Sequence, residues 1–255
     1  MVPTLGERPQ LLEQALESIR SQPLAVRVVI VAPEGDDRLR DIARQVEATL
    51  LPDPGGLGAS INAGLEYCLA DSNVEFVGWL NDDDLLEPDS MVSVVDALDD
   101  NPNAVVAFGA CRYIDERGKE LFVSKAGRWA PRILPWGPDL IPQPGMLVRS
   151  WAWRQVGGLD PSYRLAFDLD LLLRLRVLGR LQYVGRIVSS FRWHSDSLTV
   201  DGRERNLVES EKAKRQALPR FIRPLAPAWD LPVRWAIKAA ASRVNSQSAA
   251  RDSNQ

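Results

Sequence analysis

The chain has 255 residues, 45% of them hydrophobic, which suits one large domain with a proper core. Its formal net charge of -3 gives no electrostatic reason to expect nucleic acid as a partner. The two cysteines, Cys68 and Cys111, are far apart in sequence, which excludes a disulfide framework and a zinc pattern and favours a reducing, cytoplasmic compartment. With a single histidine, His194, any mechanism that needs two is excluded, and general-base chemistry falls most naturally to a carboxylate.

The first half of the chain alternates between strands and helices. The pattern predicts strands over 1–4, 26–31, 48–51 and 75–80, and helices over 9–21, 37–47, 59–69 and 89–98. Alternation at this spacing indicates a parallel sheet built from right-handed βαβ units. No apolar run reaches the roughly 18 residues that indicate a transmembrane helix, and no signal-peptide pattern opens the chain.

The second half is less regular. The pattern predicts strands over 104–110, 144–149, 181–184 and 187–193, a hairpin over 112–123, helices over 150–156, 167–178 and 203–218, and a long loop over 127–142. Gly179 is expected to end the helix over 167–178 at its C′ position. We therefore expect one domain over 1–200, a helical extension over 201–246 and a disordered polar tail over 247–255.

The segment Trp79–Pro88 carries three successive carboxylates directly after an apolar strand. Oxygen ligands of this kind suit Mg²⁺ or Mn²⁺ bound together with phosphates, and open α/β sheets bind ligands at the carboxyl ends of their strands. Pro88 suits the first turn of a helix. The local sequence leaves two interpretations open, a metal–diphosphate site and an acidic helix cap, and the strand–loop–helix context favours the first.

Three other segments also have two interpretations each. The glycine-rich segment 55–64 predicts either a phosphate cradle or a plain turn, and a dinucleotide motif fits poorly because its third glycine is replaced by Ile61. Asp168 and Asp170 are either first-turn carboxylates or, for one of them, a base in the active cleft. Arg192 and His194 lie on one side of a predicted strand, where both could reach a diphosphate or a metal; a structural role is the alternative.

Taken together, these motifs resemble the family-2 glycosyltransferases of the GT-A type, from residue 2 through residue 199. The matching segments are Val2–Arg8, Ser60–Gly64, Trp79–Asp84 with Pro88, Gln143–Pro144, Val156–Asp160, Ala166–Leu171 with Leu173–Leu175, and Arg192–Thr199. The resemblance implies an α/β fold with a Rossmann-like, mostly parallel central sheet flanked by helices, a small antiparallel acceptor-side part and C-terminal helices. It also implies a nucleotide-sugar-binding half over 1–110 and an acceptor-side half over 111–200.

The resemblance further implies inverting transfer of a sugar from a UDP-, GDP- or dTDP-linked donor to a saccharide or lipid-linked acceptor, with Mn²⁺ or Mg²⁺. By position, Asp83 and His194 match metal-binding residues, and Asp168 matches the catalytic base. The residues matched to the nucleotide sugar are Pro3, Thr4, Glu7, Arg8, Glu34, Asn62, Asn81, Asp82, Asp83 and Arg192, and those matched to the acceptor side are Trp136, Gln143 and Asp170.

The sequence departs from the family pattern in several places. Asn81 replaces the first acid of the metal motif, and Phe167 replaces the Glu that commonly precedes the catalytic Asp. Ile61 occupies a position where many members have Arg, and the loop 32–36 lacks the usual Asp pair. The first strand should be central, yet few of its residues are present, so either the true start lies upstream or the strand is stunted. Two other functions stay open: a sugar-nucleotidyltransferase, and a non-catalytic nucleotide-binding or assembly module.

Aromatic and basic residues gather in two further segments. Trp129, Trp136, Trp151 and Trp153 either offer stacking faces to a sugar or lipid acceptor or belong to the core. The segment 219–244 has five basic residues and one acid, with tryptophans between them, and is either a helix packed on the domain or a peripheral contact with the anionic inner face of a membrane.

Overall fold

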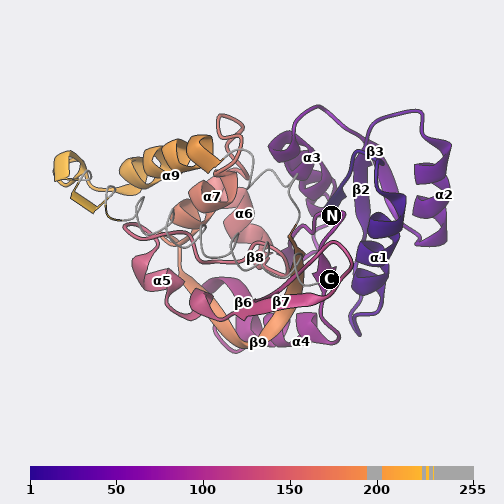
Figure 1. Cartoon of the computed structure of the whole chain (residues 1–255), viewed down its shortest axis with the longest axis horizontal. Coiled ribbons are helices and arrows are strands. Elements are labelled where there is room, and N and C mark those ends of the chain that lie inside the picture. Colours follow the sequence, from indigo (N-terminus) through magenta and orange to yellow (C-terminus); the bar gives the residue numbers. More distant parts are fainter. Residues whose placement is uncertain (194–202, 226–227, 230–231, 233–255) are drawn as a thin grey trace, which may run out of the picture.

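The computed structural model describes residues 1–193, 203–225, 228, 229 and 232. Its first sheet is parallel with the order β1-β2-β3, built from β1 (Val2–Pro3), β2 (Val29–Ala32) and β3 (Thr49–Pro52). Three helices connect these strands and continue the chain: α1 (Pro9–Arg20), α2 (Asp37–Gln45) and α3 (Leu57–Leu69). The strands and helices alternate here as the sequence predicts (Figure 1).

A second, mixed sheet forms the other side of the molecule. Its strands are β4 (Phe76–Val77), β5 (Leu85–Leu86), β6 (Ala104–Ile114), β7 (Glu120–Ser124), β8 (Leu147–Arg149) and β9 (Arg180–Arg192), in the order β4-β8-β6-β9-β5 with β7 on β6. Only β6 and β9 pair in parallel; the other pairings in this sheet are antiparallel. The remaining α-helices of the described residues are α4 (Ser90–Asp99), α5 (Ala130–Ile133), α6 (Ser150–Val156), α7 (Phe167–Leu175) and α9 (Arg203–Ala217).

Backbone hydrogen bonds of Met1 join the two sheets. The Met1 amine donates to the Gly78 carbonyl oxygen at 2.9 Å, and the Leu80 N–H donates to the Met1 carbonyl oxygen at 3.1 Å. The first strand thus lies between β2 and residues 78–80, which is the central position predicted for it. Two glycines allow this close packing: a Cβ on Gly64 would lie 2.6 Å from Met1 Cε, and one on Gly78 would lie 2.5 Å from the Met146 carbonyl oxygen.

Helix α7 is central to the larger hydrophobic core. Its buried residues include Leu169, Leu171, Leu172 and Leu173, so several of its sides face apolar neighbours. A helix that is apolar on most sides must be covered on most sides. Helices α6 and α9 both pack against it, so the C-terminal extension is part of the cover of α7 (Figure 1).

The structure corrects several predicted boundaries. The strand predicted over 75–80 pairs with β8 only at Phe76–Val77, and its remainder turns to Met1. Pro88 does not open a helix: α4 begins at Ser90, after Asp89 adopts a left-handed conformation with φ of 54°. The two strands predicted over 181–193 are one strand, β9, whose register on β6 shifts.

Two further corrections concern Gly179 and the long loop. Helix α7 ends at Leu175, so Gly179 is not its C′ residue. A Cβ at Gly179 would lie 2.5 Å from the Asn103 carbonyl oxygen, so the glycine instead allows the chain to pass close to residue 103. The loop predicted over 127–142 contains the short helix α5. Within the described residues no helix is long and apolar enough to cross a membrane.

Candidate functional site

The acidic loop 81–84 gives its three carboxylates three different environments. Asp84 is fully buried and accepts hydrogen bonds from the Arg192 backbone N–H at 3.0 Å and from Asn81 Nδ2 at 3.0 Å. Burial, and then the charge of Asp83, raise the pKa of Asp84 well above its ordinary value. Asp84 therefore supports the loop.

Asp82 and Asp83 face the start of the chain. Thr4 Oγ1 donates to Asp82 Oδ2 at 2.5 Å, and burial raises the pKa of Asp82. The Asp83 carboxylate forms an ion pair with Arg8 Nη1 at 3.4 Å and its side chain keeps 17% exposure. The structure thus brings Thr4 and Arg8 together with Asp82 and Asp83, which lie more than seventy positions further along the chain.

Arg192 holds the acidic loop in place. It is buried on β9, where its Nε donates to the Asp83 carbonyl oxygen at 3.0 Å and its Nη2 to Gln14 Oε1 at 3.2 Å. Its Nη1 donates to the carbonyl oxygens of Asp115 at 3.3 Å and Glu116 at 3.0 Å. This guanidinium serves the fold in the structure, and its contact with a diphosphate stays a prediction.

The other residues matched to the nucleotide sugar are spread more widely. Pro3 is buried in β1, whereas Glu7 and Glu34 are exposed in loops after β1 and β2. Asn62 Nδ2 donates to the Leu159 carbonyl oxygen at 2.9 Å, and its Oδ1 accepts from the Leu159 N–H at 2.9 Å. Asn62 therefore ties α3 to the turn before α7, and any contact with the donor stays a prediction.

Asp168 lies at the second position of α7, close to the strand end that leads into the acidic loop. Its Oδ1 accepts from the Leu169 N–H at 2.8 Å, and burial raises its pKa to about 6. The rings of Phe167 and Trp79 are 6.5 Å apart between centroids. This contact places the start of α7 against Trp79, two residues before Asn81.

Asp139 lies within reach of the charge of Asp168, and no sequence motif singles it out. Its Oδ1 accepts from the Ile141 N–H at 3.0 Å. Burial, and then the charge of Asp168, raise the pKa of Asp139 to about 7, while the charge of Lys214 acts in the opposite direction. The only signal in the sequence is a carboxylate in a long loop rich in Pro, Gly and Trp.

The residues matched to the acceptor side have clear structural roles. Gln143 Nε2 donates to the Trp79 carbonyl oxygen at 2.8 Å and fixes the loop to the strand end. Asp170 is buried and pairs with Arg174 Nη2 at 2.7 Å. Trp136 is exposed and its ring lies 5.4 Å from that of Trp229. Direct contact of these residues with an acceptor stays a prediction.

The described residues offer Asp83 as a ligand for the predicted metal ion. His194 lies outside the described residues, and within the part that is described no group of three or more His, Cys, Asp or Glu side chains could hold a metal ion. Asp83 nevertheless offers an accessible carboxylate. This fits a hard cation such as Mg²⁺, which takes one or two protein carboxylates and completes its shell with water and phosphate oxygens.

The sequence is similar to known glycosyltransferases. The family model described as Glycosyl transferase family 2 matches residues 1–144. The uncharacterized protein y4gI of Sinorhizobium fredii is 27% identical over 234 residues, which are 87% of this chain and 25% of the relative. The amylovoran biosynthesis glycosyltransferase AmsE of Erwinia amylovora is 32% identical over 123 residues, which are 45% of this chain and 44% of the relative. The chain thus spans less than half the length of these two relatives.

Two solved structures share the fold. The mannosyltransferase PcManGT from Pyrobaculum calidifontis, in complex with GDP-Man and Mn²⁺, matches with a TM-score of 0.65 and 18% identity, over 99% of this chain and 78% of that one. TarS 1-349 of S. aureus, in complex with UDP, matches with a TM-score of 0.59 and 14% identity, over 88% of this chain and 67% of that one. These likenesses confirm the predicted GT-A type α/β fold.

Proposed function

The chain belongs to glycosyl transferase family 2, and on that premise we propose that it is a metal-dependent, inverting glycosyltransferase. It moves a sugar from a nucleotide-diphosphate donor to a hydroxyl of a saccharide or lipid-linked acceptor. The observation that carries the proposal is the packing of Trp79 on Phe167, with ring centroids 6.5 Å apart. This contact supports a site that joins the acidic loop, which would bind the donor, to the start of α7, where Asp168 would act as the base.

The donor binds on the side of the acidic loop. Asp83 would hold the cation, which when bound neutralises charge on the departing nucleoside diphosphate. Thr4 holds Asp82 beside it, and Arg8 forms an ion pair with the Asp83 carboxylate. Complexes of PcManGT with GDP-Man and Mn²⁺ and of TarS with UDP support a nucleotide-linked donor.

Asp168 acts as the base. A half-buried carboxylate with a pKa of about 6 is ionised at neutral pH yet more basic than an ordinary Asp, which suits a group that accepts a proton during the reaction. As the acceptor hydroxyl attacks the anomeric carbon from the face opposite the diphosphate, its proton passes to Asp168. One displacement with one base inverts the anomeric centre.

A nucleotide-sugar panel tests this function. The wild-type chain is incubated with UDP-glucose, UDP-N-acetylglucosamine, GDP-mannose or dTDP-glucose, each with Mn²⁺, Mg²⁺ or EDTA, and nucleoside diphosphate release is measured. Slow release that requires the cation, and that is lost in Asp168→Asn, supports the proposal. Release of pyrophosphate from a sugar phosphate and a nucleoside triphosphate would indicate a nucleotidyltransferase. Donor binding without turnover would indicate a binding module.

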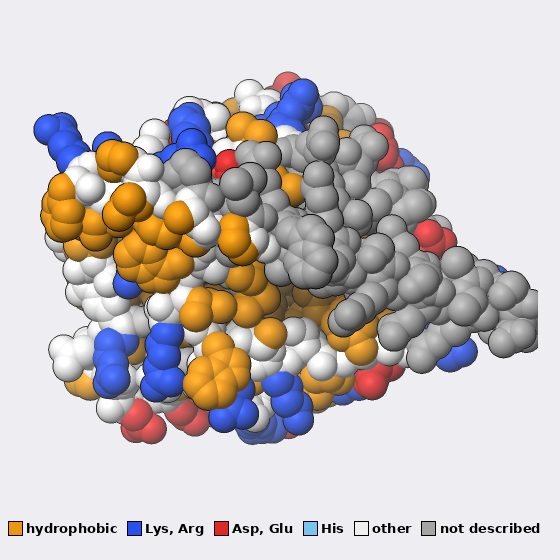
Figure 2. All heavy atoms as spheres, turned by 60° about the vertical axis from the view of Figure 1, so that its left-hand side comes forward, with side chains coloured by type: hydrophobic (Ala, Val, Ile, Leu, Met, Phe, Trp, Pro, Cys, Tyr) orange, Lys and Arg blue, Asp and Glu red, His pale blue; other side chains and the backbone are white. Residues whose placement is uncertain are grey.

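The surface around Trp129 and Phe221 supports a peripheral contact with an anionic membrane, where lipid-linked acceptors reside. Hydrophobic side chains gather on one face with Lys and Arg above and below them (Figure 2). Trp129 is 51% exposed and stacks against Arg128, and Phe221 is 80% exposed beside Arg220 in sequence. Aromatic residues next to basic ones suit such an interface. Truncation after Leu218 should lower sedimentation with phosphatidylglycerol vesicles; unchanged sedimentation would dismiss the contact.

A further inference from the structure

A carboxylate of α9 binds the backbone directly before the helix that carries Asp168. Glu209 Oε2 accepts hydrogen bonds from the backbone N–H groups of Arg164 at 3.0 Å, Leu165 at 2.8 Å and Ala166 at 3.1 Å. The chain separation is more than forty positions, so this contact is purely tertiary. It fixes three consecutive peptide groups to one oxygen atom.

The N-cap position of helix α7 supplies no side-chain hydrogen bond of its own. The N-cap residue is Ala166, whose methyl side chain cannot accept a hydrogen bond. The first N–H groups of a helix have no partner within it, and a negative charge near them is favourable. Glu209 acts on the cap residue and the two residues before it. It thereby sets the path by which the chain enters α7, two residues before Asp168.

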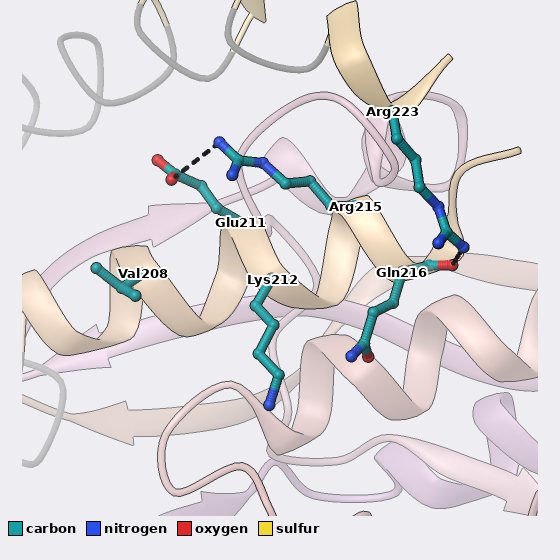
Figure 3. Close-up of a pocket in the computed structure, with 6 residues that line it drawn as sticks. All are labelled: Val208, Glu211, Lys212, Arg215, Gln216 and Arg223. Atoms are coloured by element: carbon teal, nitrogen blue, oxygen red, sulfur yellow. Dashed lines mark hydrogen bonds and ion pairs between the residues drawn. The ribbon is translucent and has the colours of Figure 1, made fainter. Parts of the chain in front are cut away.

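Other side chains of α9 hold the same segment. Gln216 Oε1 accepts from the Tyr163 hydroxyl at 2.7 Å, and Lys212 Nζ lies 4.7 Å from the Tyr163 ring centroid. In Figure 3 these two side chains point to the same side of α9, away from the paired Glu211 and Arg215. One face of α9 is thus turned to the segment that leads into α7.

We propose that Glu209 is the positioning residue for the Asp168 carboxylate, and that α9 belongs to the catalytic machinery as well as to the cover of the core. The inference rests on the proposed function, in which Asp168 is the base. In that function Glu209 contacts neither the donor nor the acceptor. Its action is to hold the peptide groups of 164–166, so that Asp168 stays in line with the attacking hydroxyl.

The expected effect falls on turnover rather than on donor binding. Glu209 binds the segment before α7, whereas Asp83, on the proposed donor side, pairs with Arg8. Displacing a catalytic group by about 1 Å can cost about 100-fold in rate. Glu209→Ala should therefore lower kcat by about 10- to 100-fold while the KM for the donor stays within about twofold.

Glu209→Gln separates charge from shape. The variant keeps an acceptor oxygen at the same length but loses the charge that strengthens the three bonds. Its kcat should lie between those of the wild type and Glu209→Ala. Glu211→Gln is the matched control, because it removes the same charge from the same helix while the ion pair of Glu211 is with Arg215, also on α9.

Amide hydrogen exchange measures the positioning directly. Peptides that span 160–170 are followed by mass spectrometry in the wild type and the three variants, and kcat and KM are measured with the donor of the panel that the wild type turns over fastest. Faster exchange in both Glu209 variants, together with a lower kcat and an unaltered Glu211→Gln, supports the proposal.

The outcomes also separate this proposal from the one it rests on. Unchanged exchange at 160–170, or faster exchange with an unchanged kcat, overturns the role of Glu209 while the glycosyltransferase activity stands. An equal loss in Glu211→Gln overturns it too, because the effect then belongs to α9 as a whole. A wild-type chain without turnover on any donor of the panel overturns the proposed function itself, and the positioning role with it.

Discussion

Replacing Asp168 by Asn should remove activity and stabilise the protein at the same time. Burial raises the pKa of Asp168 from the ordinary 3.8 to about 6. The folded protein therefore binds this proton more tightly than the unfolded chain, and stability falls as the pH rises through the window from about 4 to about 6. Above that window the ionised Asp168 destabilises the fold, because its charge is partly withdrawn from water.

The size of the effect follows from the same pKa. A rise from 3.8 to about 6 corresponds to about 3 kcal/mol. Asparagine avoids the buried charge but cannot repeat every contact of the carboxylate, so we expect a gain of about 1–3 kcal/mol at pH 7.5 and little gain at pH 4.5, where Asp168 is protonated in the fold. Loss of the base should lower turnover by about 10²–10⁴-fold.

Urea unfolding followed by tryptophan fluorescence at both pH values measures the stability, and nucleoside diphosphate release measures the turnover. Asp170→Asn is the matched control two residues along the same helix. Its carboxylate is paired with Arg174, so the control should lose about 1.5–3 kcal/mol at pH 7.5 instead of gaining stability. A less stable Asp168→Asn at pH 7.5, or one with near-normal turnover, would refute the reasoning.

Three further variants extend the test. Asp139→Asn should raise the melting temperature above pH 7, since the pKa of Asp139 is raised to about 7. The fall of kcat on the acidic side of its pH profile should stay near pH 6. A shift of that fall would make Asp139 the ionised group that turnover needs. Asp83→Ala should abolish the Mn²⁺-dependent part of the affinity for GDP or UDP in calorimetric titrations, whereas Asp71→Ala on the surface should not. If Asp83→Ala binds the nucleotide with the same Mn²⁺ dependence as the wild type, Asp83 is not the metal ligand. Arg192→Lys should lower the free energy of unfolding by about 2–3 kcal/mol, because an ammonium cannot bridge the carbonyl oxygens that the guanidinium reaches. A loss below about 0.5 kcal/mol would contradict the role of Arg192 as the support of the acidic loop.

The local pattern of apolar and polar residues predicted most of the helices and strands. It missed those that depend on contacts with distant parts of the chain. Helix α1 was predicted within a residue, because its buried face repeats every three to four positions along the chain. Strand β5 was not predicted, because its two residues, Leu85 and Leu86, are a strand only through their pairing with Ser189 and Ser190. Pro88 was assigned to a helix by propensity alone, and the left-handed Asp89 moved the start of α4.

The same limit applies to the candidate site. The residue types pointed to the acidic loop and to Asp168, since carboxylates after a strand and at a helix start are visible in the sequence. Asp139 and Glu209 were missed because nothing near either residue in the chain marks it. Each acquires its role from a segment far away, Asp139 from the charge of Asp168 and Glu209 from the amides before α7.

The sequence by itself determined the family, the alternation of strands and helices, and the two carboxylate segments that the chemistry needs. Only the tertiary structure decided which carboxylate does what. Asp84 became a support because the Arg192 backbone, 108 positions away, donates to it, and Asp83 stayed accessible beside Arg8. The physical reason is that the properties of a carboxylate depend on its burial and its partners, and both are set by contacts between distant parts of the chain.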